Sequence, residues 1–448
     1  MYELIIAVDQ NYGIGYENKL PWSCKEELQI FKNKTMNNAI IVGSNTFNHL
    51  PLLKDRDIFL LSRRISYPNT KNSYTILHDI SSAKEFTNKK IIIAGGAQVY
   101  NYALSDPKYV DTIHMSIMKK EYQCDTWFDK NLLYDFVITE EKDYEEFTHY
   151  VLQRTNSGER QYLNLLNNII KNGVEREGRN GKTRSIFTEH FKFDLREGFP
   201  LLSTKKMFIR GIIEEFLFFL RGETDSNILS QKKVRIWEGN TTKEFIKNRG
   251  LKYTEGIMGP MYGYQWRKFG QEYLTNDDGY PIDNVNNQGI DQLANVIELI
   301  KNDPYSRRIL MTSYNPSQAE EGVLYPCHSI TIQFYVDKDY LDMFCFNRSQ
   351  DTFLGVPYNI ASSSLLLMIV AKLTNKNPRF LNITMGDTHL YEQHIVQSIQ
   401  QIERLPYQFP KITIPDIQTI EQIHDLTYED FVLENYLSYS TIRAPMIV

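Results

Sequence analysis

The chain has 448 residues, of which 42% are hydrophobic, and its formal net charge is −5. This length is sufficient for two or three domains, each with its own hydrophobic core. A slightly acidic chain is not expected to bind nucleic acids or anionic membranes as a class, because both carry negative charge. Any site for an anion must therefore be built locally.

The cysteines and the apolar segments indicate the compartment. Four cysteines are scattered along the chain, and none has the Cys-x-x-Cys spacing of a zinc site or a disulfide framework. The first residues lack the basic start of a signal peptide, and the longest apolar run, 365–371, is far below the roughly 20 residues of a membrane-spanning helix. We expect a soluble cytoplasmic protein without a metal.

Residues 1–154 predict an α/β domain. Short apolar runs at 4–8, 39–42, 58–61 and 91–94 alternate with turn and helix-start residues, which is typical of a mostly parallel, twisted sheet with flanking helices. Runs at 113–118 and 147–152 are expected to close this sheet. The polar segment 155–158 predicts a short linker, and a helical spacing of apolar residues begins after it. A second domain is therefore expected over 159–448.

Two glycine-bearing turns follow predicted strands of the first domain. Gly43 follows the run 39–42, and Gly95 and Gly96 follow the run 91–94. Backbone N–H groups at the helix starts after such turns can bind a phosphate, although tight packing explains a turn of this kind more often. Ser62 and Arg63 follow the run 58–61 and suit the extra ribose phosphate of NADPH, with a solvated surface as an equal alternative.

Glu27 is the candidate acid of this domain. By helical spacing it shares a face with Ile30 and Phe31, so its carboxyl group borders apolar surface. Burial at such a place disfavours the charged form and suits proton transfer near neutral pH. On the pattern alone, an ordinary amphipathic helix with a solvated glutamate is the better explanation.

Residues 2–153 resemble dihydrofolate reductase. The motifs that carry the resemblance are Ala-Val-Asp-Gln-Asn-Tyr-Gly-Ile-Gly at 7–15, Leu-Pro-Trp at 20–22, Gly-Ser-Asn-Thr-Phe at 43–47, Gly-Gly-Ala-Gln-Val-Tyr at 95–100 and Asp-Thr at 125–126. The resemblance implies that Glu27 holds the pterin ring and assists its protonation, with support from Ser116. It also implies a folate slot lined by Phe31 and Leu50, with Arg56 bound to the α-carboxylate of folate.

The same resemblance implies an NADPH site. Its expected members are Ala7, Ile14, Gly43, Thr46, Ser62, Arg63, Gly95, Gly96, Ala97, Gln98 and Val99. Two positions depart from the family. Ala94 stands where a larger aliphatic residue is usual, and Ser116 replaces the commoner threonine. Neither change removes a chemical group that hydride transfer needs.

Cys327 is the candidate nucleophile of the second domain. A cysteine attacks as its thiolate, and nearby positive charge lowers the pKa of the thiol. Arg307, Arg308 and Arg348, together with Ser349, suit a dianionic phosphate. Taken one at a time, a buried structural thiol and a surface cluster of arginines are the alternatives.

The segment 208–220 predicts a helix that is apolar on nearly all sides and is therefore buried. A carboxylate on such a helix is costly unless it is paired or used. Helical periodicity does not choose between Glu214 and Glu215. Trp237 and the run 259–263 provide aromatic surface for a flat ring, with core packing as an equal alternative.

Residues 159–448 resemble thymidylate synthase along nearly their full length. The matching segments are 199–206, 259–267, 326–328, 348–351, 353–361, 386–391 and 443–448. The whole chain therefore resembles the fused dihydrofolate reductase–thymidylate synthase family, and its second domain is expected to have an α+β fold.

This resemblance implies reductive methylation of dUMP by 5,10-methylenetetrahydrofolate, and then reduction of the dihydrofolate product with NADPH. Cys327 would add to C6 of dUMP, Glu215 would organise water and proton transfers, and Tyr262 would assist removal of the C5 proton. The expected contacts of dUMP are Arg179, Arg307, Arg308, Arg348, Ser349, Asn359, His389 and Tyr391, and those of folate are Trp237, Asp351 and Val448; Asn359 and Asp351 also belong to the expected catalytic set.

In this family the residues at Arg307 and Arg308 reach the phosphate site of the neighbouring subunit, which implies a two-fold homodimer. Asn359 favours dUMP, because an amide matches the N3–H and O4 of uracil in one orientation. A water-quenched reaction that gives a hydroxymethylpyrimidine is disfavoured by Asn359 and Trp237. A non-enzymatic folate- or nucleotide-binding regulator is disfavoured because the candidate catalytic residues are all intact.

Two further departures concern the second domain. The loop that holds Arg179 is one residue shorter than in relatives, and four residues instead of three lie between His328 and Gln333. An inserted residue in a strand reverses every later side chain unless a β-bulge absorbs it. A bulge is therefore predicted just after His328.

Overall fold

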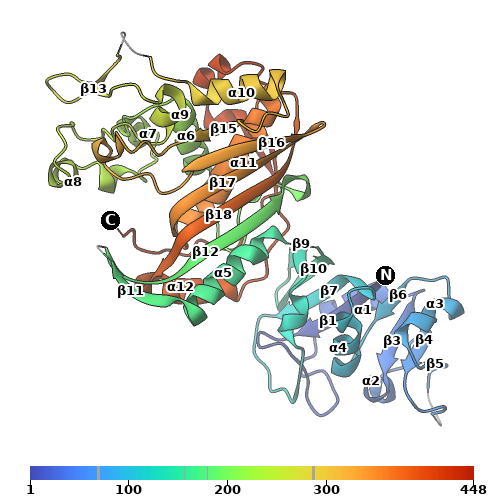
Figure 1. Ribbon diagram of the computed structural model, residues 1–448. Helices are drawn as coiled ribbons and strands as arrows, with labels where there is room; N and C mark the ends of the chain where they lie inside the picture. Colours follow the sequence, from blue (N-terminus) through green and yellow to red (C-terminus); the bar gives the residue numbers. More distant parts are fainter. Residues whose placement is uncertain (68–70, 156, 179, 285–287, 448) are drawn as a thin grey trace. The chain divides into compact units, whose positions relative to one another are not determined.

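The computed structural model describes residues 1–67, 71–155, 157–178, 180–284 and 288–447, and they form two compact units (Figure 1). The first unit comprises Met1–Ser157 with Leu405–Gln408, and the second comprises Gly158–Arg404 with Phe409–Val448. The short segment Leu405–Gln408, expected in the second domain, falls in the first unit because its backbone bonds to Ile138. The Ile138 N–H donates to Pro406 O at 2.9 Å, and the Gln408 N–H donates to Ile138 O at 2.9 Å.

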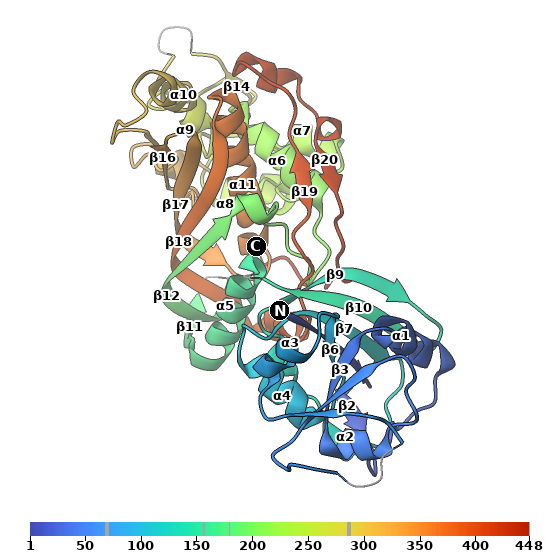
Figure 2. The ribbon, with the colours of Figure 1, turned by 90° about the vertical axis from the view of Figure 1, so that its right-hand side faces the viewer.

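The first unit is built on an eight-stranded sheet with the order β5-β4-β3-β6-β1-β7-β10-β9. Its strands are β1 (Tyr2–Val8), β3 (Ala39–Gly43), β4 (Asp57–Leu61), β5 (Thr75–Leu77), β6 (Ile91–Ile93), β7 (Val110–Met118), β9 (Phe136–Asp143) and β10 (Phe147–Arg154). All neighbours pair in parallel except β10, which is antiparallel to both β7 and β9. Figure 2 shows β9 and β10 as a long hairpin. The predicted, mostly parallel sheet is confirmed.

The helices of this unit are α1 (Lys25–Thr35), α2 (Ser44–His49), α3 (Ala83–Phe86) and α4 (Ala97–Ser105). A small ladder joins β2 (Gly13–Gly15) to β8 (Thr126–Trp127). Both α2 and α4 begin directly after a glycine at the carboxyl end of a parallel strand, which is where open α/β sheets bind their ligands.

The second unit has a six-stranded mixed sheet with the order β11-β12-β18-β17-β16-β15 (Figure 1). The strands are β11 (Val174–Gly178), β12 (Gly181–Asp194), β15 (Leu310–Thr312), β16 (Thr331–Asp337), β17 (Tyr340–Asp351) and β18 (Asn377–Tyr391). Two-residue and three-residue strands form the small pairs β13 (Leu274–Thr275) with β14 (Pro281–Ile282), and β19 (Lys411–Thr413) with β20 (Val432–Glu434).

Helices pack against this sheet, as expected for an α+β domain. They are α5 (Gly158–Asn172), α6 (Ile209–Leu220), α7 (Asn227–Gln231), α8 (Lys243–Asn248), α9 (Gly263–Lys268), α10 (Gln292–Asn302), α11 (Gly355–Leu373) and α12 (Ile395–Ile402). The helix α11 packs on β17 and β18 and also contacts α6, so one face of the sheet belongs to the core. By length and composition α11 is apolar enough to cross a membrane, but most of it is buried inside the unit.

The backbone after His328 is irregular, as the inserted residue predicts. Ser329 has a φ of 53°, and β16 begins only at Thr331. The Ile330 N–H donates to Phe346 O at 2.8 Å, although the ladder pairs Thr331 with Phe346. Two successive residues therefore face one residue of β17, which is the arrangement of a β-bulge.

Candidate active sites

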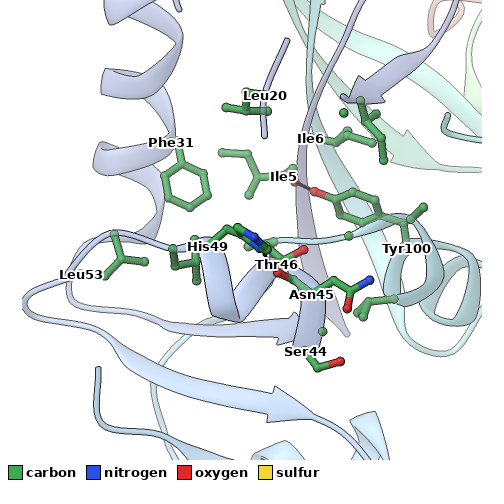
Figure 3. A pocket seen from close by; sticks show the side chains of 18 of the residues that line it. Ile5, Ile6, Leu20, Phe31, Ser44, Asn45, Thr46, His49, Leu53 and Tyr100 are labelled. Atoms are coloured by element: carbon green, nitrogen blue, oxygen red, sulfur yellow. Dashed lines mark hydrogen bonds between the residues drawn. The ribbon is translucent and has the colours of Figure 1, made fainter. Parts of the chain in front are cut away.

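A cavity of about 1820 Å³ opens in the first unit at the carboxyl ends of its parallel strands. Figure 3 shows Phe31 of α1, Ile5 of β1 and Thr46 of α2 around it. The Tyr100 hydroxyl of α4 donates to Ile5 O at 2.8 Å and so fixes α4 against β1. Helices, strands and the loop after α2 thus all contribute to the lining of the cavity.

Glu27 lies on the buried face of α1 and lines this cavity. Its side chain is only 5% exposed, and burial raises the pKa of its carboxyl group to about 7. The predicted apolar surroundings are therefore present. A carboxyl group with this pKa carries a proton for much of the time at neutral pH, so it can donate one.

Ten of the eleven residues expected around NADPH line the cavity; Gly95 does not. Those ten are Ala7, Ile14, Gly43, Thr46, Ser62, Arg63, Gly96, Ala97, Gln98 and Val99. A Cβ at Gly96 would meet Thr46 Oγ1 at 2.9 Å, and a Cβ at Gly43 would meet Val99 Cγ2 at 2.9 Å. A side chain at either position would therefore crowd a neighbouring side chain. This arrangement fits a dinucleotide.

Phe31, Leu50 and Arg56, the residues expected around folate, line the same cavity. The Arg56 Nε donates to Thr35 Oγ1 at 2.9 Å, and Nη1 and Nη2 donate to Lys54 O at 2.7 Å and Lys32 O at 3.3 Å. These bonds hold the guanidinium group at the cavity wall. A fixed guanidinium group suits a carboxylate.

The structure describes a hydrogen bond of Ser116 with a histidine and none with Glu27. Its hydroxyl pairs with His149 Nδ1 at 3.1 Å, and Ser116 is not among the cavity-lining residues. Burial lowers the pKa of His149 to about 4, so this imidazole is neutral near pH 7. The expected hydroxyl support of Glu27 is not among the described hydrogen bonds. His149 was missed because a single histidine in a strand reads as an ordinary core residue.

Cys327 lies in the second unit directly beside Tyr262. The Tyr262 hydroxyl is 3.3 Å from Cys327 Sγ, and the Cys327 N–H donates to the same oxygen at 3.2 Å. Burial raises the pKa of the Cys327 thiol, whereas the Tyr262 hydrogen bond and the charge of Arg348 act in the opposite direction. In the free protein burial outweighs the guanidinium charge, so the thiol form dominates at neutral pH.

Arg348 holds the segment that leads to the nucleophile. Its Nε donates to Pro326 O at 2.7 Å and its Nη2 donates to Tyr325 O at 3.1 Å. Its side chain remains exposed, and the Ser349 N–H donates to Cys327 O at 3.3 Å. The Arg348 charge therefore acts on the Cys327 thiol, and the backbone of Ser349 is bonded to that of Cys327.

The structure distinguishes the two glutamates of α6. Glu214 forms an ion pair with Lys232 at 2.6 Å. Glu215 instead accepts a hydrogen bond from Trp237 Nε1 at 2.8 Å, and burial raises the pKa of its carboxyl group to about 7. The Trp237 ring lies 6.1 Å from that of Tyr262, which places Glu215 on the side of the nucleophile. Glu215 is therefore the carboxyl group available for proton transfer.

Parallel pairing of β17 and β18 brings the other predicted residues together. Ser349 pairs with Asp387, and Asp351 pairs with His389. His389 and Tyr391 are alternate residues of β18, so they share a face, and their rings are 5.5 Å apart. Asp351 Oδ1 accepts hydrogen bonds from the backbone N–H groups of Phe353 and Leu354.

Asn359 is oriented by a residue that the sequence did not single out as a site residue. Its Nδ2 donates to Gln350 Oε1 at 2.8 Å, and the buried Gln350 donates in turn to Ser349 O at 2.9 Å. This leaves Asn359 Oδ1 as an acceptor and one N–H as a donor.

His328 was missed as well; its ring stacks on Tyr262 with centroids 4.3 Å apart. Its position next to Cys327 was the available signal.

Arg307 and Arg308 are exposed, and their guanidinium groups make no hydrogen bond or ion pair with any residue that the structure describes. Arg179 and Val448 lie outside the described residues. Within the described ranges there is no group of three or more histidine, cysteine or acidic side chains that could hold a metal ion.

The folds and the two sites define an enzyme that joins a dinucleotide-dependent reductase to a thiol-dependent nucleotide-modifying domain. The family model for dihydrofolate reductase matches residues 1–156, and that for thymidylate synthase matches residues 160–448. Bifunctional dihydrofolate reductase-thymidylate synthase of Paramecium tetraurelia is 36% identical over 467 residues, which cover 100% of this chain and 99% of that protein. The proteins of the same name from Zea mays and Leishmania major are 32% and 31% identical, and their alignments cover 100% of this chain and 97% and 95% of those proteins.

The chain belongs to the bifunctional dihydrofolate reductase–thymidylate synthase family. It therefore carries thymidylate synthase and dihydrofolate reductase in one polypeptide, with folate as the shared substrate, and the predicted activities are confirmed. The reductase uses NADPH, and the synthase uses methylenetetrahydrofolate.

Proposed function

We propose that Cys327 is the nucleophile that converts dUMP to dTMP in the second unit, and that Glu27 is the acid that serves dihydrofolate reduction in the first. The observation that carries the first assignment is the contact of the Tyr262 hydroxyl with both Cys327 Sγ and the Cys327 N–H. A hydrogen bond to sulfur strengthens when the sulfur becomes an anion. It therefore stabilises the reactive thiolate more than the resting thiol.

In the proposed reaction the thiolate bonds to C6 of dUMP, and C5 bonds to the methylene group of the folate. Loss of the C5 proton, assisted by Tyr262 and by water held at Glu215, lets tetrahydrofolate leave. A hydride from tetrahydrofolate then turns the methylene group into methyl while the C6–S bond breaks, which leaves dTMP and dihydrofolate. Glu215 suits this role because burial raises the pKa of its carboxyl group to about 7, so it can take and return protons near neutral pH.

We assign the dUMP phosphate to Arg348 and Ser349, the deoxyribose hydroxyl to His389 and Tyr391, and the uracil edge to Asn359. Gln350 supports the last assignment, because it takes one N–H of the Asn359 amide and leaves Oδ1 to accept the uracil N3–H. Asp351 and Trp237 are assigned to the folate.

In the first unit we assign Arg56 to the α-carboxylate of dihydrofolate and Phe31 and Leu50 to its ring system. NADPH supplies the hydride. Glu27, whose carboxyl pKa burial raises to about 7, holds the pterin and supports its protonation. Ser116, whose hydroxyl pairs with His149 Nδ1, has no assigned contact with Glu27.

We further propose a homodimer formed through the open face of the second unit's sheet. Alternate residues of β16 are buried, but Tyr335 on the opposite face is 67% exposed, and Leu310 of β15 is 45% exposed. Phe344 and Phe346 of β17 lie on the same face as Tyr335 and are only partly buried. A second copy would cover this apolar face, and Arg307 and Arg308, whose guanidinium groups have no partner among the described residues, would then reach the partner's phosphate site. We place this dimer in the cytoplasm, with domains over 1–154 and 159–448 and a linker over 155–158.

The test is a coupled assay that supplies dUMP, methylenetetrahydrofolate and NADPH to the full chain. Cys327→Ser is expected to abolish dTMP formation and leave NADPH-dependent reduction of dihydrofolate unchanged, and Glu27→Gln is expected to do the reverse. Fluorinated dUMP with methylenetetrahydrofolate should trap a covalent adduct on Cys327, detected by mass spectrometry. Loss of both activities in either folded variant, or an absent adduct, contradicts the assignment.

A further inference from the structure

The β-bulge after His328 decides which residue of β17 lies opposite Cys327. On one side of the bulge Thr331 pairs with Phe346, and on the other side the Ser349 N–H donates to Cys327 O at 3.3 Å. Four residue steps separate Cys327 from Thr331, but only three separate Phe346 from Ser349, so the extra residue lies between these two contacts. An extra residue placed elsewhere would shift Cys327 by one position along β17 and reverse the side to which it points.

Buried side chains bind the backbone at this bulge. Ser329 is only 7% exposed, so its backbone groups need partners inside the protein. Its N–H donates to Asn347 Oδ1 at 2.7 Å, and its carbonyl oxygen accepts a hydrogen bond from Ser313 Oγ at 2.7 Å. Thr312 Oγ1 donates to Ile330 O at 2.6 Å. Side chains from both flanking segments, β17 and the end of β15, thus hold the bulge.

The bulge is connected to the nucleophile through the ring of His328. Ser329 Oγ lies 3.2 Å from His328 Nδ1, and the His328 ring stacks on Tyr262 with an interplanar angle of 18°. The Tyr262 hydroxyl is in turn 3.3 Å from Cys327 Sγ. A displacement of Ser329 would therefore disturb both the stacked rings and the contact of the phenol with the sulfur.

We infer that Asn347 is a positioning residue of the synthase, which holds the bulge at Ser329 and so keeps Cys327 Sγ beside the Tyr262 hydroxyl. The inference rests on the proposed function of the second unit. Asn347 is 1% exposed, and its Oδ1 accepts the Ser329 N–H and the Cys345 thiol, whereas its Nδ2 has no hydrogen-bond partner among the described residues. Without this oxygen the buried Ser329 N–H loses its acceptor, which disfavours a bulge at this place.

The test compares four substitutions in the full chain. Asn347→Leu removes the acceptor and keeps a branched side chain of similar length, whereas Asn347→Asp keeps the acceptor oxygen. Ser313→Ala removes the other bond to the bulge. Ser398→Ala is its matched control, because Ser398 is also buried and its Oγ donates to a backbone carbonyl, His394 O, at 2.8 Å in another part of the unit.

Asn347→Leu is expected to lower kcat for dTMP formation about 10- to 100-fold, because a small displacement of a reacting group is costly. KM for dUMP should stay near the parental value, since the proposed contacts of its phosphate and deoxyribose lie on β17 and β18. The pH dependence of Cys327 alkylation by iodoacetamide, located by peptide mass spectrometry, should move to higher pH as the sulfur leaves the Tyr262 hydroxyl. Asn347→Asp should restore most of kcat. Ser313→Ala should shift the alkylation profile in the same direction as Asn347→Leu, and Ser398→Ala should leave it unchanged.

An unchanged alkylation profile in folded Asn347→Leu, or equal losses of kcat in the Leu and Asp variants, would overturn the inference. Equal shifts in Ser313→Ala and Ser398→Ala would overturn it as well, and this comparison decides if Asn347→Leu does not fold. A parent chain that makes no dTMP contradicts the proposed function, whereas the alkylation comparison still reports where the thiol lies.

Discussion

The phenolic oxygen of Tyr262 lies 3.3 Å from Cys327 Sγ and accepts the Cys327 backbone N–H at 3.2 Å. Because the oxygen is occupied as an acceptor by the N–H group, its own hydrogen is available to the sulfur. Burial raises the pKa of Tyr262 well above its ordinary value, so the phenol keeps that hydrogen throughout the working pH range. Tyr262 is thus a hydrogen-bond donor held at the thiol by the nucleophile's own backbone.

Tyr262→Phe should raise the pKa of the Cys327 thiol, because the mutant loses a hydrogen bond that favours the thiolate. We expect kcat for dTMP formation to fall about 10- to 100-fold, the effect of a lost hydrogen bond to a charged group. The pH dependence of Cys327 alkylation by iodoacetamide should shift to higher pH. Reductase activity serves as the internal control. An unchanged alkylation profile would show that the phenol does not act on the sulfur.

Trp237→Phe should affect the other buried acid of this site. Burial raises the pKa of the Glu215 carboxyl group to about 7. The hydrogen bond from the Trp237 N–H acts in the opposite direction, because it favours the carboxylate. Without the N–H the pKa rises further, so the acidic limb of the kcat profile for dTMP formation should move up by about one pH unit, or about 1.4 kcal/mol. Trp266→Phe is the matched control, because Trp266 is buried in the same unit and its Nε1 has no hydrogen-bond partner among the described residues. A shift of equal size in both variants would point to packing instead.

Glu215 also shows where prediction from sequence stops. The apolar run 208–220 predicts a buried helix, and α6 spans Ile209–Leu220. Periodicity places Glu214 and Glu215 on adjacent sides of that helix and gives no preference. Lys232 pairs with one and Trp237 with the other, and these partners are distant in sequence. Their approach depends on tertiary packing, which no local pattern contains.

The same limit applies to edges and to single polar residues. Apolar runs predicted the central strands of the first sheet, but β5 and β9 were missed, because edge strands such as these are short or mostly polar on one side. Ser116 was expected beside Glu27 because the family places a hydroxyl group there. In this chain His149 faces Ser116 from the neighbouring strand β10 and takes its hydroxyl group. By contrast, the inserted residue after His328 predicted a bulge. Without one, every later side chain of the strand would point to the opposite face of the sheet.

Glu27→Gln should change how stability depends on pH. The pKa of Glu27 is about 7 in the folded protein and 4.5 ordinarily, so the folded state binds the proton more tightly. Between pH 4.5 and pH 7 the Glu27 carboxyl group ionises in the unfolded chain but largely keeps its proton in the folded protein. The free energy of unfolding therefore falls by about 3 kcal/mol over this range. Glutamine does not titrate. The stability of Glu27→Gln relative to the parent should therefore grow by about 3 kcal/mol between pH 4 and pH 8 in urea unfolding followed by a reductase-unit probe. Glu26→Gln, at the exposed neighbouring position, should show no such trend.

Arg307 and Arg308 provide a test of the dimer that separates it from a monomer with distant arginines. Each subunit with Arg307→Ala and Arg308→Ala keeps its own Cys327, and each Cys327→Ser subunit keeps its own arginines. If the arginines act on the partner's phosphate site, a mixed dimer contains one site with both defects and one site with none. Random mixing gives half mixed dimers, so about a quarter of the parental dTMP activity should return when the two inactive variants are mixed under conditions that allow subunit exchange. If the arginines serve their own subunit, every site in the mixture carries a defect and no activity returns. The reductase activity of the mixture should stay at the parental level in either case, which confirms that subunit exchange has not damaged the chain.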